Sequence, residues 1–309
     1  MNSILEVKNV VKKYGDYTAL NSVSLSVPKG CIYGLLGPNG AGKTSLIRII
    51  NQITMPDSGQ VFLDGEILQP KHIQHIGYLP EERGLYKSMK VGEQCLYLAQ
   101  LKGLSKTEAK KQLDYWFDKL EIQGWWNKKI EELSKGMAQK VQFVVCVLHQ
   151  PKLLIFDEPF SGFDPVNANL IKDEILELKQ KGATIIFSTH RMESVEELCD
   201  EIALIHKSNK MLDGKINDIK RQFRNNVFEV GIISLNNNLK KEDLFEEIRH
   251  KFRAIETNFR SLDDELKLEI ALENKSSNDL LNFLTSKGQV THFLEKIPSI
   301  NDIFIQTVS

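Results

Sequence analysis

The chain has 309 residues, of which 41% are hydrophobic and 26% are charged, as is usual for a globular protein of about two domains. This composition excludes a fully disordered chain. The formal net charge of −1 gives no electrostatic reason to expect nucleic-acid binding. No apolar stretch approaches the roughly 18 residues of a membrane-spanning helix, and the N-terminus has no signal-peptide pattern. We therefore expect a cytoplasmic protein.

The first two thirds of the chain alternate short apolar runs with helical patterns. Strands are predicted at Ile4–Val11, Val23–Val27, Ile32–Leu36, Gln60–Leu63, Ile76–Leu79, Leu153–Phe156, Thr184–Ser188 and Ile202–His206. Helices are predicted from about Gly42 and at Pro165–Gln180 and Met192–Leu198. Apolar strands separated by helices are typical of an α/β domain with a mostly parallel, covered sheet. We place this domain at residues 1–218.

A stretch from about Met89 to Gln150 interrupts this alternation with helical spacing throughout. Helices are predicted at Val91–Lys102, Thr107–Leu120 and Gly136–Leu148. The stretch therefore indicates a helical insertion, residues 89–150, within the α/β domain.

The pattern changes again after about Arg221. It predicts a strand at Val227–Leu235, a helix at Lys241–Phe252, an ambiguous segment at Arg253–Phe259, a strand at Leu266–Leu272, a helix at Asn278–Lys287 and a strand at Gln289–Phe293. The order β-α-β-β-α-β is typical of a small ferredoxin-like α+β sandwich. We therefore expect a second domain at residues 221–309.

A glycine-rich turn connects the predicted strand Ile32–Leu36 to the helix that begins near Gly42. It reads Gly37, Pro38, Asn39, Gly40, Ala41, Gly42, Lys43, Thr44 and Ser45. Up to Thr44 this run matches the phosphate-binding pattern GxxxxGK[ST] in the required context. Glycines let backbone N–H groups approach phosphate oxygens, and a helix N-terminus favours anions. We expect Lys43 to reach the β- and γ-phosphates of a nucleotide and the Thr44 hydroxyl to contact Mg²⁺.

Two adjacent carboxylates, Asp157 and Glu158, end the apolar strand Leu153–Phe156. Asp157 is placed to hold the hydration shell of Mg²⁺, as the strand aspartate does in other phosphate-loop ATPases. Glu158 is expected to point the opposite way along the pleat, where a carboxylate could polarise an attacking water. The pair therefore predicts hydrolysis as well as binding of the nucleotide.

Further motifs make the resemblance to the ATP-binding-cassette (ABC) proteins specific. The run Leu133–Met137, LSKGM, resembles the LSGGQ signature of that family. Tyr14 stands where the family has an aromatic side chain that stacks on adenine. The run Ser161–Asp164 resembles the D-loop, and His190 resembles the switch histidine. The motifs follow in the family's order, and the resemblance covers about Ile4–Gly214. It implies the family's α/β cassette fold, with a mostly parallel sheet core, an antiparallel β subdomain and a helical insertion.

The resemblance implies a mechanism in which two cassettes pair head to tail. Each ATP would lie between the phosphate loop of one cassette and the signature of the other, where Ser134 and Gly136 open a helix towards the γ-phosphate. His190 would hold the geometry of attack, and Asp164 would connect the two sites across the interface. One cassette per chain implies a dimer; we expect a homodimer and leave a heterodimer open.

Two departures from the family pattern point to a subgroup. The signature has Lys135 and Met137 where the broad family has Gly and Gln, and Glu81 stands at the Q-loop position in place of Gln. Glu81 could offer a charged oxygen to Mg²⁺ or point away from it. Both departures are similar to those in a subgroup of ATPases of ABC-2 type exporters. That subgroup often carries a C-terminal extension like the one after Arg221.

The resemblance therefore implies the ATP-hydrolysing subunit of an ABC-2 type exporter. It would dock on the cytoplasmic face of the membrane through integral membrane permease subunits, with no nucleic acid as a partner. One alternative is an ABC ATPase acting on ribosomes or DNA without a permease; such proteins usually have two cassettes or a long coiled coil. Another alternative is a non-hydrolysing regulatory module. The transported substrate and the role of the C-terminal domain are not encoded in these motifs.

Overall fold

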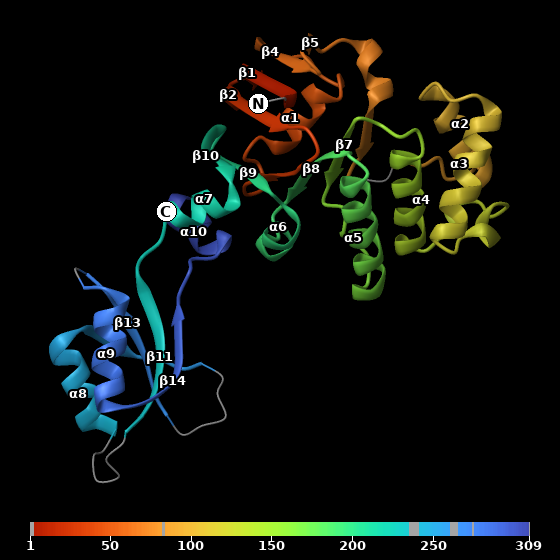
Figure 1. Cartoon of the computed structure of the whole chain (residues 1–309). Helices are drawn as coiled ribbons and strands as arrows, with labels where there is room; N and C mark the ends of the chain where they lie inside the picture. Colours follow the sequence, from red (N-terminus) through yellow and green to blue (C-terminus); the bar gives the residue numbers. More distant parts are fainter. Residues whose placement is uncertain (1–2, 82–83, 235–240, 260–264, 274, 309) are drawn as a thin grey trace. The chain divides into compact units, whose positions relative to one another are not determined.

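The structure, a computed structural model, describes residues 3–81, 84–234, 241–259, 265–273 and 275–308. The chain forms two compact units, Met1–Ile216 with Thr307–Ser309 and Asn217–Gln306 (Figure 1). Each unit is described separately below.

A small antiparallel sheet begins the first unit. Strands β1 (Ser3–Tyr14) and β2 (Tyr17–Pro28) form a hairpin, β4 (Ser58–Leu63) pairs with the other edge of β1, and β5 (Glu66–Ile67) extends β4. Apolar residues of β1 such as Leu5, Val7 and Val10 are buried, because side chains on one face of a strand point to the same side. This sheet is the antiparallel β subdomain that the sequence predicted.

The second sheet of this unit has the order β10-β9-β3-β8-β7-β6. Its strands are β3 (Ile32–Leu36), β6 (Ile76–Leu79), β7 (Leu153–Asp157), β8 (Thr184–Thr189), β9 (Glu201–His206) and β10 (Asn209–Lys215). The first five are parallel, and β10 pairs antiparallel with β9. Because parallel strands end at the same edge, the segments that follow β3, β6, β7 and β8 all begin along that edge.

Both faces of the parallel sheet are covered, as continuous apolar strands require. Alternate residues of neighbouring strands enter different cores: Phe156 and Phe187 pack among the residues of the helical insertion, whereas Ile155 and Ile186 pack with helix α1 (Lys43–Ile50) and the antiparallel sheet. The unit therefore has the layered α/β architecture that the sequence predicted.

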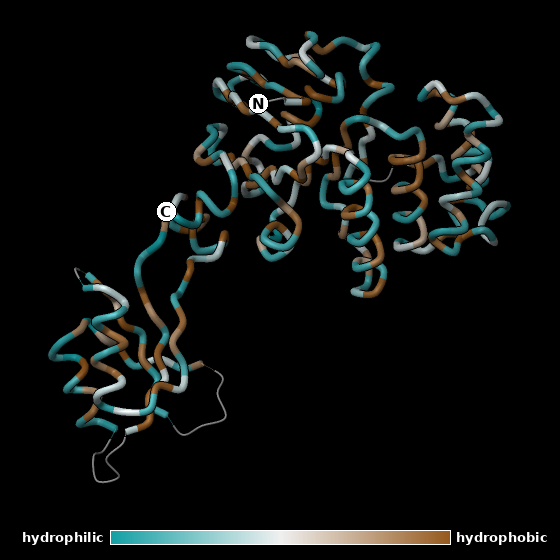
Figure 2. Tube along the Cα trace, viewed as in Figure 1, coloured by the Kyte–Doolittle hydropathy of each residue, from teal (hydrophilic) through white to brown (hydrophobic). Residues whose placement is uncertain are grey.

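The helical insertion consists of α2 (Val91–Leu101), α3 (Lys106–Lys119) and α4 (Lys135–Val147). Figure 2 shows α4 as mostly hydrophobic and α3 as mostly hydrophilic, in agreement with the eight buried residues of α4, among them Val141, Phe143 and Val144. Helices α5 (Pro165–Gln180) and α6 (Met192–Leu198) follow β7 and β8. Among the described residues, no helix combines the length and hydrophobicity needed to cross a bilayer.

The second unit contains β11 (Val227–Ser234), α8 (Lys241–Lys251), β12 (Arg253–Glu256), β13 (Leu266–Ala271), α9 (Ser277–Lys287) and β14 (Gly288–Glu295). The sheet is antiparallel with the order β12-β13-β11-β14. In β13, Leu266, Leu268 and Ile270 are buried and alternate with partly exposed residues. The order of the strands confirms the predicted ferredoxin-like topology. Within the ambiguous segment after Phe252, residues Arg253–Glu256 form the edge strand β12. Leu235, the last residue of the first predicted strand, lies outside the described residues.

Several elements of the structure were not predicted from the sequence. Strand β10 has the sequence NKMLDGK and buries none of its residues, so it carries no apolar signal. The helices α7 (Ile216–Gln222) and α10 (Ile300–Val308) and the two-residue strand β5 were also not predicted.

Candidate functional site

The phosphate loop lies between β3 and α1, at the edge where the parallel strands end. Gly37 and Gly42 have φ angles of 146° and 116°, a backbone region that other L-residues avoid. An added Cβ would also overlap the carbonyl oxygen of Ile205 at Gly37 and that of Ala19 at Gly42. These two positions therefore require glycine for conformation and for space.

Lys43, the first residue of α1, is buried, with 8% of its surface exposed. Its ammonium donates to the carbonyl oxygens of Gly37 at 2.7 Å and of Pro38 at 3.2 Å, so it lies at the centre of its own loop. Burial lowers the pKa of Lys43, and the nearby carboxylates Asp157 and Glu158 oppose that shift. The loop therefore concentrates positive charge and donors where a polyphosphate would bind.

Asp157 ends β7 and Glu158 follows it. Both are buried, with exposed fractions of 4% and 9%. Burial raises the pKa of Asp157, and the like charges of Glu81 and Glu158 add to the rise while Lys43 opposes it. The prediction that Glu158 continues the alternation of the strand is wrong, because its φ of 49° lies in the left-handed region. Its direction is therefore set by this turn and not by strand alternation.

Residues that follow β8 hold the Glu158 carboxylate. The backbone N–H of His190 donates to Oε1 at 2.9 Å, and Nδ1 of the His190 ring lies 2.6 Å from the same oxygen. The Thr189 hydroxyl donates to Oε2 at 3.1 Å. The structure thus brings together Glu158 and His190, two of the three predicted catalytic residues with Lys43. It adds Thr189, which only its place directly before His190 could have indicated.

The predicted metal ligands are Thr44, Asp157 and Glu81. Thr44 stands in the first turn of α1, and the like charge of Glu81 is among the causes that raise the pKa of Asp157. The described residues contain no group of three or more His, Cys, Asp or Glu side chains able to hold an ion alone. Mg²⁺ binds through one or two protein oxygens together with phosphate oxygens and waters, and Thr44, Asp157 and Glu81 are side chains with such oxygens.

The signature run begins α4. Ser134 is the N-cap of this helix, and its hydroxyl accepts from the backbone N–H of Met137 at 3.2 Å. Gly136 lies in the first turn, so N–H groups of an exposed helix start are available to an anion. Asp164 caps α5 in the same way, with Oδ1 accepting from the N–H of Asn167 at 3.0 Å.

An aromatic hairpin lies beside the phosphate loop. Tyr14 ends β1, with 45% of its surface exposed, and pairs with Tyr17 across the turn. The Tyr17 hydroxyl donates to the carbonyl oxygen of Gly40 at 2.6 Å. The sequence did not indicate this contact of Tyr17 with the phosphate loop, because Tyr17 belongs to no recognised sequence motif.

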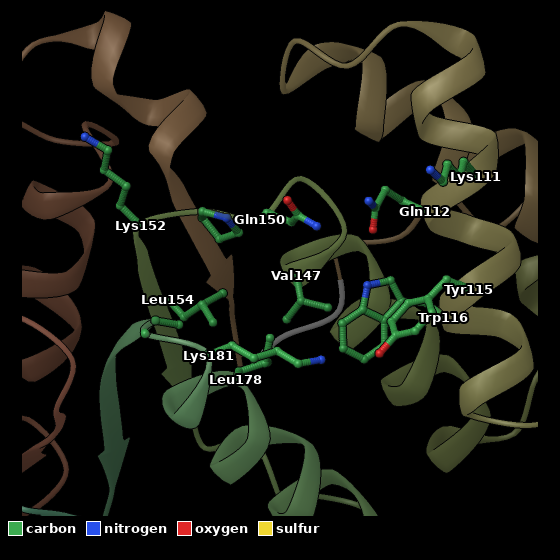
Figure 3. A pocket seen from close by; sticks show the side chains of 13 residues that line it. Lys111, Gln112, Tyr115, Trp116, Val147, Gln150, Lys152, Leu154, Leu178 and Lys181 are labelled. Carbon is green, nitrogen blue, oxygen red and sulfur yellow. The ribbon is translucent and has the colours of Figure 1, made fainter.

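A cavity of about 590 Å³ lies elsewhere in this unit. Its wall includes Tyr115 and Trp116 from α3, Leu154 near the start of β7 and Lys181 after α5 (Figure 3). These segments surround the amino end of β7, whereas the phosphate loop, Asp157 and His190 follow carboxyl ends. The cavity is therefore separate from the predicted nucleotide site.

A family model described as ABC transporter matches residues 20–161. The uncharacterized ABC transporter ATP-binding protein YhaQ of Bacillus subtilis (strain 168) is 42% identical over 306 residues, covering 99% of this chain and 98% of that protein. The chain belongs to the ABC transporter ATP-binding proteins. It is thus an ATPase that binds ATP, as the motifs predicted.

Other similarities extend this assignment to both units. A model described as the C-terminal domain of DrrA1-3-like ATP-binding proteins matches residues 214–308. The linearmycin resistance ATP-binding protein LnrL of Bacillus subtilis is 35% identical over 70% of each chain. A solved ATP-binding subunit of an ABC transporter, 33% identical, superposes with a TM-score of 0.67 over 72% of this chain and 93% of that one. These matches confirm the predicted family and fold, and they favour an ABC-2 type exporter ATPase over a cassette that acts without a permease.

Proposed function

We propose that this ABC ATPase powers export of a solute through separate permease subunits, with two copies of the chain forming the ATPase dimer. Two features support export: the similarity of residues 214–308 to the DrrA1-3-like C-terminal domain, and the similarity to a protein named for linearmycin resistance. ATP-binding subunits of ABC transporters act in pairs together with membrane permeases. The proposal adds that the pair is a homodimer on the cytoplasmic face of the membrane.

The observation that carries the proposed chemistry is the contact of His190 and Thr189 with both oxygens of the Glu158 carboxylate. A carboxylate fixed in this way, one residue after Asp157, is oriented to accept a proton from water that attacks the γ-phosphate. The products are ADP and inorganic phosphate. Lys43, the backbone N–H groups of the loop between Gly37 and Ser45 (all but that of Pro38, which has none) and the ring of Tyr14 would bind ATP in the same cassette.

Residues of the opposite cassette would complete the site. Ser134 and Gly136, exposed or partly exposed at the start of α4, would face the γ-phosphate with hydroxyl and N–H donors. Asp164, exposed at the start of α5, would link the two sites. Thr44, Asp157 and Glu81 would hold Mg²⁺, which supplies positive charge that neutralises the phosphate oxygens during phosphoryl transfer.

Two variants test this assignment in the purified protein. Glu158→Gln should retain ATP binding and lower hydrolysis by about 100-fold or more, as loss of a general base does. Lys43→Ala should instead weaken ATP binding itself, because it removes the buried cation of the loop. Phosphate release and equilibrium binding of ATP distinguish the two effects. Normal turnover by Glu158→Gln would rule out Glu158 as the catalytic carboxylate.

A further inference from the structure

The side chain of Lys135, at the start of α4, lies directly over the Cα atom of Gly162. A Cβ added at Gly162 would overlap Lys135 Cε and would lie 2.7 Å from Cδ and 3.0 Å from Cγ. Gly162 has a φ of 87°, so the loop here is in a conformation that favours glycine. The absence of a Cβ thus lets the aliphatic stem of Lys135 lie against the loop backbone.

Two further contacts join the same helix to the same loop. A Cβ added at Gly136 would lie 3.8 Å from a ring carbon of Phe163, so the first turn of α4 is close to that ring. One turn on, the buried amide of Gln139 donates to the carbonyl oxygen of Pro159 at 3.5 Å. The loop from Glu158 to Asp164 therefore contacts the start of α4 at Pro159, Gly162 and Phe163.

This loop ends at two residues with proposed roles. At one end, the N–H of Ser161 donates to the carbonyl oxygen of Glu158 at 3.0 Å, which fixes the turn that carries the carboxylate. At the other end, Asp164 caps α5. A shift of the loop away from α4 would therefore displace both the Glu158 turn and the Asp164 cap.

We propose that Lys135 is a positioning residue: its stem holds the loop 158–164 against the signature helix and so keeps Glu158 and Asp164 in register with Ser134 and Gly136. The proposal rests on the roles assigned to these four residues above. Its physical basis is packing by the methylene groups, which cover apolar and backbone surface while the ammonium stays in solvent. The charge of Lys135 is not required for this role.

The test separates the stem from the charge. Lys135→Met keeps an unbranched chain as far as Cε and removes the ammonium, whereas Lys135→Ala removes the stem and preserves the helix. Lys140→Ala on the same helix is the matched control. The first readout is hydrogen–deuterium exchange of the full-length protein without nucleotide, followed in the segment 158–164. The second is kcat and KM for ATP.

For Lys135→Ala we expect faster exchange of the Ser161 and Phe163 amides, by about fivefold or more, because local opening becomes easier. We expect kcat to fall by about tenfold, since small displacements of a reacting group are costly, with KM for ATP within about twofold because the phosphate loop is untouched. Lys135→Met and Lys140→Ala should match the wild type in both readouts.

Three outcomes would overturn the proposal: unchanged exchange in Lys135→Ala, faster exchange with unchanged kcat, or a defect in Lys135→Met equal to that of Lys135→Ala. The last result would assign the role to the charge. The exchange measurement needs no nucleotide, so a failure of the catalytic assignment, seen as normal turnover by Glu158→Gln, is distinguishable from a failure of the Lys135 proposal.

Discussion

The Nδ1 atom of His190 lies 2.6 Å from Oε1 of Glu158, and the His190 backbone N–H donates to the same oxygen. Glu158 follows β7 and His190 follows the neighbouring parallel strand β8, so the pairing depends on adjacent strands ending together. The imidazole is largely exposed while the carboxylate is buried. The exposed His190 ring therefore contacts the buried Glu158 carboxylate from the solvent side.

Replacement of His190 should separate the orientation of the Glu158 carboxylate from the binding of ATP. In His190→Ala we expect hydrolysis to fall by about 10- to 100-fold, because the carboxylate loses its ring partner while retaining the backbone donor. ATP affinity should change little, since Lys43 and its loop are intact. Thr189→Ser, which keeps the hydroxyl donor to Oε2, is the control. Phosphate-release assays alongside ATP titrations give the answer; a wild-type rate in His190→Ala would contradict the role.

The head-to-tail arrangement predicts assembly that depends on ATP. A Glu158→Gln protein, which we expect to bind ATP and hydrolyse it slowly, should shift from monomer towards dimer on addition of MgATP, whereas ADP should have no such effect. Multi-angle light scattering measures this mass. Ser134→Arg should abolish the shift, because a bulky cation at the exposed N-cap of α4 blocks the approach of the second cassette. Dimerisation of that variant equal to the parent's would argue against the sandwich.

Glu81 should alter the dependence on magnesium if it contacts the metal. A carboxylate attracts a hard dication more strongly than an amide oxygen does, and it repels the γ-phosphate when the metal is absent. Hydrolysis by the wild type should therefore depend more steeply on Mg²⁺ than hydrolysis by Glu81→Gln. That variant should bind metal-free ATP at least as tightly. Superimposable Mg²⁺ titrations of the two proteins would leave Glu81 without a part in metal binding.

We also predict that the C-terminal unit is separable from the cassette. The segment Arg224–Asn226 is exposed and lies outside helices and strands, so limited trypsin digestion should cut near residues 220–224. The released cassette should still bind ATP, because every residue assigned to the nucleotide lies before residue 191. Fluorescence of a bound ATP analogue on the purified fragment is the measurement, and an unfolded fragment by circular dichroism would show the boundary to be wrong.

Stability should depend on pH through His149. Burial lowers the pKa of this imidazole to about 4, Lys102 adds to the shift and the Ile76 carbonyl opposes it. In the unfolded chain the ring titrates near its usual pKa of about 6.5. As the pH falls from about 6.5 towards 4, His149 becomes protonated in the unfolded state before it does in the folded state. The free energy of unfolding therefore decreases across this pH range, and the stability contributed by the neutral ring is fully present only above it.

At about 1.4 kcal/mol per pKa unit, the loss is at most about 3 kcal/mol. His149→Gln should therefore show a smaller decrease in the free energy of unfolding between pH 6.5 and 4.5, measured by urea titration. His250→Gln, at an exposed position, should retain the wild-type dependence. An identical decrease in wild type and His149→Gln would exclude His149 as its source.

The sequence by itself determined most of the strands and helices of both units and the order of the motifs, but not β5, β10, α7 or α10. Regular apolar spacing predicted Ile32–Leu36, Pro165–Gln180 and Met192–Leu198 with the bounds that the structure shows. Such spacing can be read locally, because the period at which apolar residues recur differs between a helix and a strand. The phosphate loop was predictable for a similar reason: its glycines satisfy a local backbone requirement that shows in the sequence.

Tertiary structure decided what depends on segments distant in the chain. The approach of His190 and Thr189 to the Glu158 carboxylate follows from the parallel pairing of β7 with β8. The contact of Tyr17 with Gly40 instead joins the antiparallel sheet to the phosphate loop. The packing of Lys135 over Gly162 joins positions 27 residues apart. No local pattern encodes such contacts, because they arise only when the hydrophobic cores bring the elements together.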